Sequence, residues 1–195
     1  MRLSDRRSAA TPKPAARARR PTGVFGDVYH LRTWLWLPAP RERVFAFFAD
    51  AHNLERITPP FLAFRVLNTE PIHLETGARI DYRLRLHGVP LRWQTAITVW
   101  DPPSRFRDTQ VRGPYREWVH THAFEDEDKG TRVTDHVRYR LPGPPLASHV
   151  VNALLVGPDT RRIFEFRHTA LVQAFDAEGT AKLGPVTIDR LSGPR

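Results

Sequence analysis

The hydrophobic pattern of this chain changes period once, and the change limits the folds open to it. In the first three quarters, short segments alternate between apolar and polar residues, as strands with one buried face do. The clearest is Ala78–Leu86, with Ile80, Tyr82 and Leu84 on one face and arginines on the other. From Leu146 to Phe175 the apolar residues recur at helical spacing instead. Antiparallel strands need a cover for their apolar face, and only this helix is large enough.

The predicted order is one strand, two short helices, six further strands and a long C-terminal helix. The expected strands are Tyr29–Leu37, Phe64–Thr69, Ala78–Leu86, Leu91–Trp100, Arg105–Arg112, Arg116–Phe124 and Thr131–Leu141, and the expected short helices are Arg41–Asp50 and Asn53–Ile57. Because Gly157-Pro158 falls inside the long helix, we expect a break or kink there, with Asp159 capping the second half. The fold class is α+β, with a curved antiparallel sheet of about seven strands.

The basic charge lies mainly outside these elements. The formal net charge is +9, of which residues 1–20 contribute +6 and residues 177–195 contribute +1, leaving +2 for residues 21–176. We therefore expect a disordered basic tail over 1–24, one folded domain over 25–176 and a flexible C-terminal tail over 177–195. The basic tail fits three interpretations: a solvated extension, a contact to nucleic acid or an anionic membrane, or an organelle transit peptide.

Composition excludes several classes of protein. The absence of cysteine excludes a disulfide scaffold, a thiol nucleophile and a Cys-ligated metal site. The longest apolar stretches, Val44–Ala49 and Val150–Val156, are far shorter than the roughly 20 residues of a membrane span. The small charge of the folded part argues against nucleic-acid binding. We expect a soluble, cytoplasmic protein whose basic tail makes at most transient contact with a membrane surface.

Polar side chains occur on faces that the alternation predicts to be buried. His120 and His122 share a face with aromatic residues of one strand, and Asp135 lies among apolar residues of the next. These strands form a hairpin, so its register places Asp135 opposite His122 or His120, roughly 5 Å away between Cβ atoms. Asp108 and Gln110 share the face of Phe106 on the preceding strand and are candidates to join them. A buried carboxylate needs such a partner, and it makes an imidazole easier to protonate.

Four interpretations of this cluster are open. It is a structural network that sets the sheet register, an anchor for the polar group of a ligand, a general acid–base pair, or a metal site of His120, His122 and Asp135. The helical His-x-x-x-His pattern of many metal sites does not occur in the sequence. We therefore expect no metal and no other cofactor.

Specific sequence motifs accompany this order of elements. They are Pro40-x-x-x-Val44-Phe45-x-Phe47-Phe48-x-Asp50, Asn53-Leu54-x-x-Ile57-Thr58-Pro59-Pro60, Gly88-x-Pro90-x-x-Trp93, Gly113-Pro114-Tyr115-x-x-Trp118-x-His120-x-His122-x-Phe124 and Gly130-Thr131-x-Val133-x-Asp135-x-Val137-x-Tyr139. With them, the chain resembles the START/Bet v 1-like (SRPBCC) superfamily, in its polyketide-cyclase-like ligand-binding branch. The resemblance covers about residues 28–176. It implies a helix-grip fold, in which a bent sheet wraps around the C-terminal helix and encloses a cavity between them.

The resemblance also implies a function, the binding or carrying of an apolar small molecule such as a lipid, quinone, polyketide or aromatic metabolite. The candidate ligand-binding residues are Ile80, Tyr82, Leu84, Trp93, Ile97, Trp118, His120, His122, Phe124, Asp135 and Tyr139. One alternative is an enzyme of the cyclase or dehydratase kind, with His120, His122 and Asp135 as catalytic candidates. Another is a protein-interaction module with a filled core, which a cavity below roughly 300 Å³ would favour.

Overall fold

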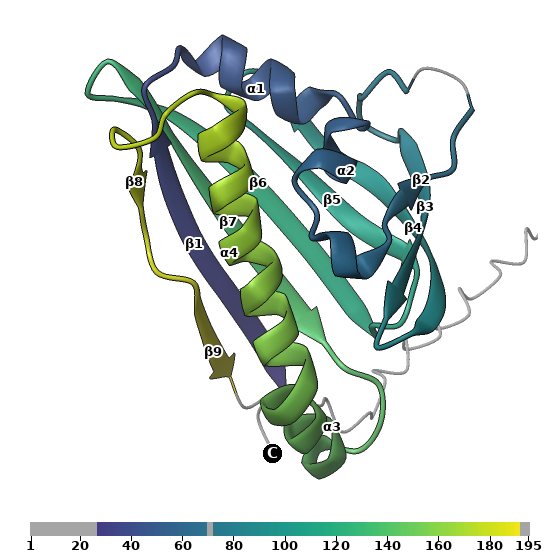
Figure 1. Cartoon of the computed structure of the whole chain (residues 1–195). Helices are drawn as coiled ribbons and strands as arrows, with labels where there is room; N and C mark the ends of the chain where they lie inside the picture. Colours follow the sequence, from purple (N-terminus) through teal and green to yellow (C-terminus); the bar gives the residue numbers. More distant parts are fainter. Residues whose placement is uncertain (1–26, 70–71, 192–195) are drawn as a thin grey trace, which may run out of the picture.

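The computed structural model describes residues 27–69 and 72–191 of the chain (Figure 1). The basic tail predicted over 1–24 lies outside the described residues. The strands are β1 (Val28–Leu37), β2 (Arg65–Val66), β3 (Arg79–Leu86), β4 (Val89–Asp101), β5 (Arg105–Arg112), β6 (Glu117–Glu127), β7 (Gly130–Arg140), β8 (Lys182–Leu183) and β9 (Thr187–Leu191). The helices are α1 (Arg41–Ala49), α2 (Asn53–Arg56), a 3-10 turn (Pro60–Leu62), α3 (Pro145–Val151), a π-helical turn (Asn152–Val156) and α4 (Gly157–Ala174).

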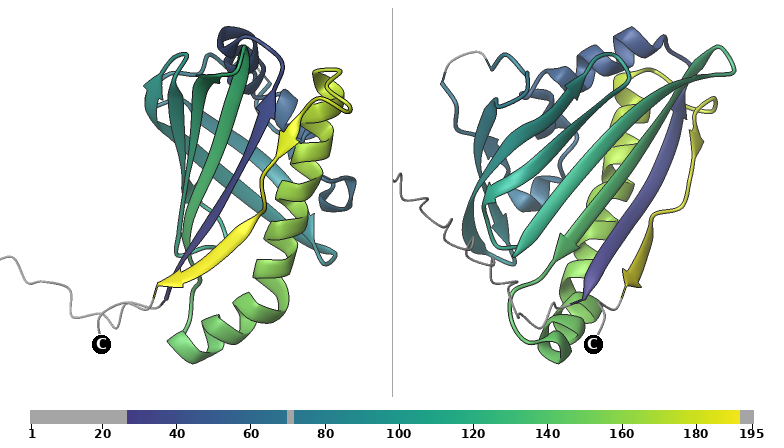
Figure 2. Two further views of the ribbon diagram at one scale, coloured as in Figure 1. Left: turned by 90° about the vertical axis from the view of Figure 1, so that its left-hand side faces the viewer. Right: turned by 180° about the vertical axis from the view of Figure 1, so that it is seen from behind.

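One antiparallel sheet forms a layer, and the helices pack on one side of it. The strand order is β2-β3-β4-β5-β6-β7-β1-β8, and β9 also pairs with β1. The helix α4 crosses the part of the sheet near β1, β6 and β7, whereas α1 and α2 lie over the other part (Figure 1). Seen from behind, the opposite face of the sheet carries none of the described helices (Figure 2). This arrangement confirms the predicted helix-grip architecture.

The described sheet has nine strands where about seven were expected, because the C-terminal segment is ordered. The prediction of a flexible tail over 177–195 is wrong for residues 182–183 and 187–191, which form β8 and β9 along β1. The edge of β1 offers unpaired backbone groups that such a segment can satisfy. Gly184 permits the close approach, since a Cβ atom there would lie 2.3 Å from Nε1 of Trp34. Val186, 5% exposed, anchors the segment in the core.

The long helix continues through Gly157-Pro158, where a break or kink was expected. The chain forms a π-helical turn over Asn152–Val156, and the backbone N–H of Gly157 donates to the carbonyl of Asn152, five residues earlier. A π turn of this kind inserts one extra residue into a helix and so shifts its hydrogen-bond pattern before the proline, which has no N–H. Asp159 lies in the first turn of α4 and does not cap it. Its carboxylate instead accepts a hydrogen bond from Nε2 of His87, at 2.7 Å.

The apolar core consists of two clusters on the inner face of the sheet. One lies beneath α1 and includes Phe48 and Phe106, and the other lies beneath α4 and includes Phe164. The histidines of β6 contact both clusters. The ring of His122 stacks on Phe106 at 4.1 Å, and the ring of His120 packs edgewise on Phe164 at 5.5 Å. The polar cluster therefore lies where the two halves of the core meet.

Candidate functional site

Three neighbouring strands bring the predicted polar residues together. In the β6–β7 hairpin Phe124 pairs with Val133, so His122 faces Asp135. On the other side of β6, Asp108 of β5 faces His120. Because residues two apart on a strand point to the same side, both histidines project from the inner face. Of the two registers left open by the sequence, the first is therefore correct.

The four side chains form a closed ring of contacts. Nε2 of His120 donates to Oδ1 of Asp135 at 2.7 Å, and Nδ1 of His122 lies 2.9 Å from the same oxygen. On the other side, Nε2 of His122 donates to Oδ2 of Asp108 at 3.1 Å, and Nδ1 of His120 lies 3.7 Å from it. Thr95 donates from Oγ1 to the other Asp108 oxygen at 3.3 Å. Every imidazole nitrogen thus faces a carboxylate oxygen.

Arg167 is a fifth member, which sequence reasoning missed. It projects from α4 and its side chain is only 9% exposed, with Nη1 3.9 Å from Oδ1 of Asp135. Nε and Nη1 are buried and have no hydrogen-bond partner among the described residues. The available signal was an arginine within the apolar stripe of the long helix, between Phe164 and Leu171. A buried guanidinium in such a stripe indicates a carboxylate beneath it.

The environment separates the protonation states of the two histidines. Burial, followed by the neighbouring His122, lowers the pKa of His120 to about 4. Burial also disfavours charge on His122, but hydrogen bonds to Asp108 and Asp135 outweigh it and raise its pKa. Burial opposes ionisation of Asp108 and Asp135, yet their contacts with the histidines prevail, lowering the pKa of Asp108 and holding that of Asp135 well below its usual range. The environment therefore favours the charged form of His122 and the neutral form of His120.

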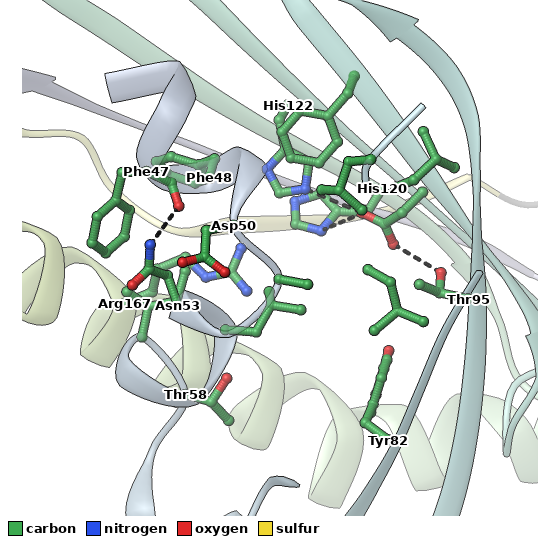
Figure 3. Close-up of a pocket in the computed structure, with 18 of the residues that line it drawn as sticks. Phe47, Phe48, Asp50, Asn53, Thr58, Tyr82, Thr95, His120, His122 and Arg167 are labelled. Carbon is green, nitrogen blue, oxygen red and sulfur yellow. Dashed lines mark hydrogen bonds and ion pairs between the residues drawn. The ribbon is translucent and has the colours of Figure 1, made fainter. Parts of the chain in front are cut away.

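A pocket with a volume of about 120 Å³ opens beside this cluster (Figure 3). Its charged wall consists of Asp108, His120, His122 and Arg167. The rest of the lining comes mainly from α1, α2, the segments that follow them and the strands β3 to β6. Arg167 is the single contribution of α4 to this lining. The cavity was expected between the sheet and the C-terminal helix, and the structure places it chiefly beneath α1 and α2 because the core fills the space under α4.

The predicted site residues divide into two groups. Those that line the pocket are Ile80, Tyr82, Ile97, Trp118, His120 and His122, whereas Leu84, Trp93, Phe124, Asp135 and Tyr139 lie outside the lining. Phe124 is 1% exposed in the core beneath α1, and Asp135 lies behind the histidines with no exposed surface. Tyr139 stacks on Tyr29 and donates its hydroxyl to Oδ1 of Asn152 at 2.7 Å. Strand alternation identifies the inner face, but it does not tell which inner residues border a cavity.

Residues outside the sheet complete the pocket. Phe47, Phe48, Asn53 and Leu54 of α1 and α2 cover one side, as Figure 3 shows for the labelled Phe47, Phe48 and Asn53. Their sequence pattern indicated only short helices, so none of them was among the candidate site residues. Asn53 donates to the carbonyl of Phe47 at 2.8 Å, which ties the second helix to the first. The two helices that cover this side of the pocket, α1 and α2, are therefore tied to each other.

Comparison with known proteins agrees with this architecture. A family described as "Polyketide cyclase / dehydrase and lipid transport" matches residues 37–163. No curated protein matches the chain. Among solved structures, TTHA0849 from Thermus thermophilus is 23% identical with a TM-score of 0.61, covering 77% of this chain and 99% of that one. Major latex-like protein 151 from Panax ginseng is 12% identical with a TM-score of 0.54, covering 78% of this chain and 99% of that one.

A third similar structure is protein Ms6760 from Mycobacterium smegmatis, 20% identical with a TM-score of 0.56, covering 76% of this chain and 91% of that one. At these identities the likeness concerns the fold. The family match is different in kind, because it spans more than half of the chain. The chain therefore belongs to the polyketide cyclase/dehydrase and lipid transport family, within the START/Bet v 1-like superfamily that its sequence resembles.

Proposed function

We propose that this protein binds a small molecule that has an apolar ring and one polar oxygen group, in the pocket beneath α1 and α2. The observation that carries the proposal is the two-sided lining, apolar on one wall and charged on the other. Ligand sites commonly combine an apolar surface with a few convergent polar groups that orient the ligand. The family to which the chain belongs includes proteins of lipid transport by its description, which agrees with a binding role.

The pocket volume selects among the four ligand classes expected from the sequence. At about 120 Å³ it is comparable to an engineered cavity of about 150 Å³ that binds benzene. It is smaller than the roughly 300 Å³ at the lower end for drug-sized ligands. An aromatic metabolite with a single ring is therefore the best match. A lipid, quinone or polyketide requires Phe47 and Phe48 to move outward, and the small volume also favours the alternative of a filled interaction module.

The charged wall indicates which polar group the ligand carries. Arg167 lines the pocket with two buried nitrogens that have no hydrogen-bond partner among the described residues. A guanidinium donates and does not accept, so it favours a carbonyl or carboxylate oxygen. Such a group on the ring would satisfy donors that the protein leaves unpaired. We therefore expect an aromatic acid or ketone to bind more tightly than the bare ring.

An enzymatic function is the second candidate, and the two histidines support it. An imidazole with a lowered pKa, His120, and one with a raised pKa, His122, lie with their ring centroids 3.8 Å apart on the same pocket wall. Such a pair offers a base and an acid to one substrate, as cyclisation or dehydration of a polyketide requires.

Among the described residues, no helix is long and apolar enough to cross a membrane. The cytoplasmic location stays a prediction.

The test is a titration of the full chain with benzene, acetophenone and benzoate, followed by two-dimensional ¹H–¹⁵N NMR. We expect shifts at pocket residues and at least tenfold tighter binding of acetophenone or benzoate than of benzene. The variant Ala51→Leu fills the pocket, since Ala51 is 2% exposed and lines it. The matched control is Ala46→Leu on the exposed side of α1. Binding should weaken at least tenfold in the first variant and stay unchanged in the second.

Two outcomes would contradict the proposal. Absence of pocket shifts with all three probes would show a filled core, and equal binding by both variants would place the ligand elsewhere. Mass spectrometry of small molecules that co-purify with the protein from its own host separates carrier from enzyme. A carrier returns an added ligand unchanged, whereas a cyclase returns a cyclised isomer of the same mass and a dehydratase returns a product lighter by one water.

A further inference from the structure

Four imidazole nitrogens and two carboxylates converge at the pocket wall in a way that proton sharing alone does not satisfy. Each nitrogen of His120 and His122 faces an oxygen of Asp108 or Asp135. Full pairing requires a proton on all four nitrogens, which would place two imidazolium rings 3.8 Å apart. A cation between the histidines and Asp108, in place of the additional protons on the nitrogens that face Asp108, would remove this conflict.

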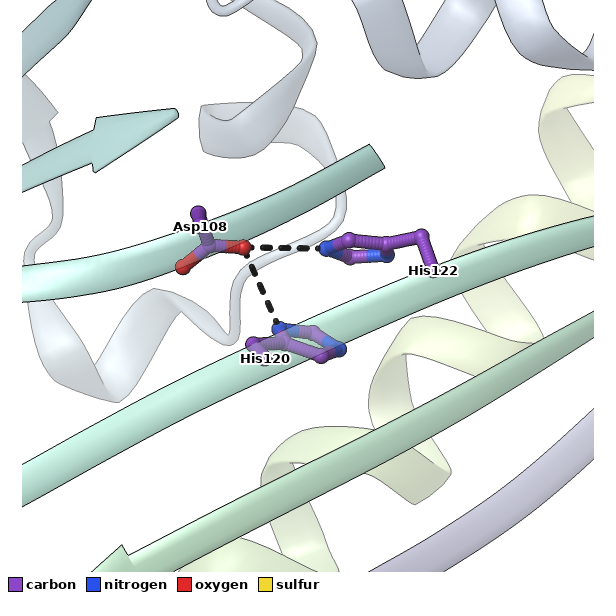
Figure 4. A group of neighbouring side chains, drawn as sticks. All are labelled: Asp108, His120 and His122. Atoms are coloured by element: carbon purple, nitrogen blue, oxygen red, sulfur yellow. Dashed lines mark hydrogen bonds and ion pairs between the residues drawn. The ribbon is translucent and has the colours of Figure 1, made fainter. Parts of the chain in front are cut away.

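We propose that Asp108, His120 and His122 bind a divalent transition-metal ion at the wall of the pocket (Figure 4). Their three ligand atoms all lie within 4.8 Å of one another. Two histidines and one carboxylate with open positions are a common ligand set for zinc and for non-haem iron. The set differs from the one considered from the sequence, since Asp108 replaces Asp135 as the carboxylate ligand.

Asp135 orients both histidines for this role. Its Oδ1 accepts from Nε2 of His120 at 2.7 Å and lies 2.9 Å from Nδ1 of His122. With protons on these two nitrogens, the lone pairs of Nδ1 of His120 and Nε2 of His122 both face Oδ2 of Asp108. Histidines that bind metals commonly donate their other N–H to a carboxylate in this manner. One buried carboxylate thus selects the tautomers of both rings.

The distances suit a metal ion with little rearrangement. Ligand atoms about 2.1 Å from a metal lie about 3.0 Å apart at a right angle and about 3.4 Å apart at a tetrahedral angle. Oδ2 of Asp108 is 3.1 Å from Nε2 of His122 and 3.7 Å from Nδ1 of His120. The second distance needs to shorten by a few tenths of an ångström. Thr95 holds the other Asp108 oxygen at 3.3 Å, which directs Oδ2 toward the histidines.

Charge and position also favour a cation here. With both rings neutral, as metal ligation requires, Asp108, Asp135 and Arg167 sum to −1 in a buried site, and this negative charge attracts a cation. All three ligands line the pocket, so the open positions of the metal face the cavity. There an oxygen of a small molecule could complete the coordination. The metal site itself does not depend on the proposed aromatic ligand.

The experiment uses the full chain after treatment with EDTA and dialysis, with Zn²⁺ titrated by calorimetry and Co²⁺ by visible absorption. We expect one equivalent of Zn²⁺ to bind, and a Co²⁺ spectrum typical of nitrogen and oxygen ligation. His122→Gln removes a ligand and should weaken Zn²⁺ binding at least a hundredfold. Asp135→Asn removes the orienting carboxylate and should weaken it about 10- to 100-fold.

The matched control is the other close histidine pair, on the outer face of the sheet. Nδ1 of His30 and Nε2 of His136 are 2.8 Å apart, so this pair is the obvious competing metal site. The double variant His30→Gln/His136→Gln leaves the pocket intact and should keep both Zn²⁺ affinity and the Co²⁺ spectrum. This control tests whether Zn²⁺ binds at the outer histidine pair even if His122→Gln does not fold. Loss of binding in the double variant, or no one-equivalent binding by the wild type, would overturn the proposal.

Discussion

Replacing Asp135 with asparagine tests whether the buried cluster is held by balanced charge. The metal-free cluster carries negative Asp108 and Asp135 and positive Arg167, with His120 neutral at pH 7 and the raised pKa of His122 favouring its positive form. The side chain of Asp135 has no exposed surface, so solvent does not screen it. Asp135→Asn removes one negative charge at nearly constant volume. One positive charge is then left without compensation in the core.

The size of the effect follows from this imbalance. Removing one partner of a buried ion pair typically lowers the free energy of unfolding by about 3–5 kcal/mol. For a domain of this size, about 1 kcal/mol corresponds to about 2–4 °C in the melting temperature. We therefore expect Asp135→Asn to melt roughly 6–20 °C below the wild type at pH 7. The amide oxygen still accepts one hydrogen bond from a histidine, so the lower half of this range is the closer expectation.

Thermal unfolding followed by circular dichroism, in EDTA, measures the difference. The control is Asp189→Asn, since Asp189 pairs with Arg32 at 3.0 Å but its side chain is 60% exposed. An exposed pair contributes about 0–1 kcal/mol, so this variant should melt within about 4 °C of the wild type. Equal melting temperatures for the two variants at pH 7 would refute the reasoning.

The pH dependence gives an independent check of the same charge. The folded state holds the pKa of Asp135 well below its usual range, so the folded protein keeps this carboxylate ionised after the unfolded chain has become protonated. Its contribution is fully present above about pH 4 and is lost as the pH falls toward the folded pKa. The gap between the wild type and Asp135→Asn should therefore be largest near neutrality and shrink below about pH 4.

Three further predictions concern single side chains. Because burial lowers the pKa of His120 to about 4, the unfolded chain takes up a proton at this residue between pH 7 and 5 that the folded state does not. This residue alone should therefore lower the stability of the metal-free protein by about 2 kcal/mol over that range, and pH-dependent thermal melts of His120→Gln should lack this contribution. Gly130→Ala would place a Cβ atom 2.3 Å from the Leu37 carbonyl oxygen, so its urea midpoint should fall by an amount equal to about 1–3 kcal/mol. Tyr139→Phe keeps the ring but leaves Oδ1 of Asn152 without its 2.7 Å donor, and urea unfolding should show a loss of about 1–3 kcal/mol with an unchanged slope.

Much of the fold and four of the five members of the polar cluster were predictable because strand alternation is a local property. The period-2 pattern identified the inner face, and a hairpin register allowed only His120 or His122 opposite Asp135. Arg167 was missed because its role depends on where α4 crosses the sheet. The pocket lining from α1 and α2 was missed for the same reason. Contacts between elements far apart in the chain are not encoded in any single segment's periodicity.

The C-terminal segment was mispredicted for a different physical reason. Its two strands are short, and glycine and proline lie between the helix and β9. Such a segment has little strand propensity of its own. It becomes ordered because β1 already presents a row of backbone donors and acceptors. A strand that is stabilised mainly by its partner strand is only weakly indicated by its own sequence pattern.

The pairing of β8 and β9 with β1 has a consequence for anyone who shortens this chain. Cutting after Asp176, where the helical pattern ends, would uncover the edge of β1 from Val28 to Trp36. It would also remove the contact of Gly184 with the Trp34 ring. An uncovered edge next to a large aromatic surface is a template on which a second molecule can add a strand. β8 and β9 thus protect the molecule against self-association, and a fragment without them should aggregate although its pocket is complete.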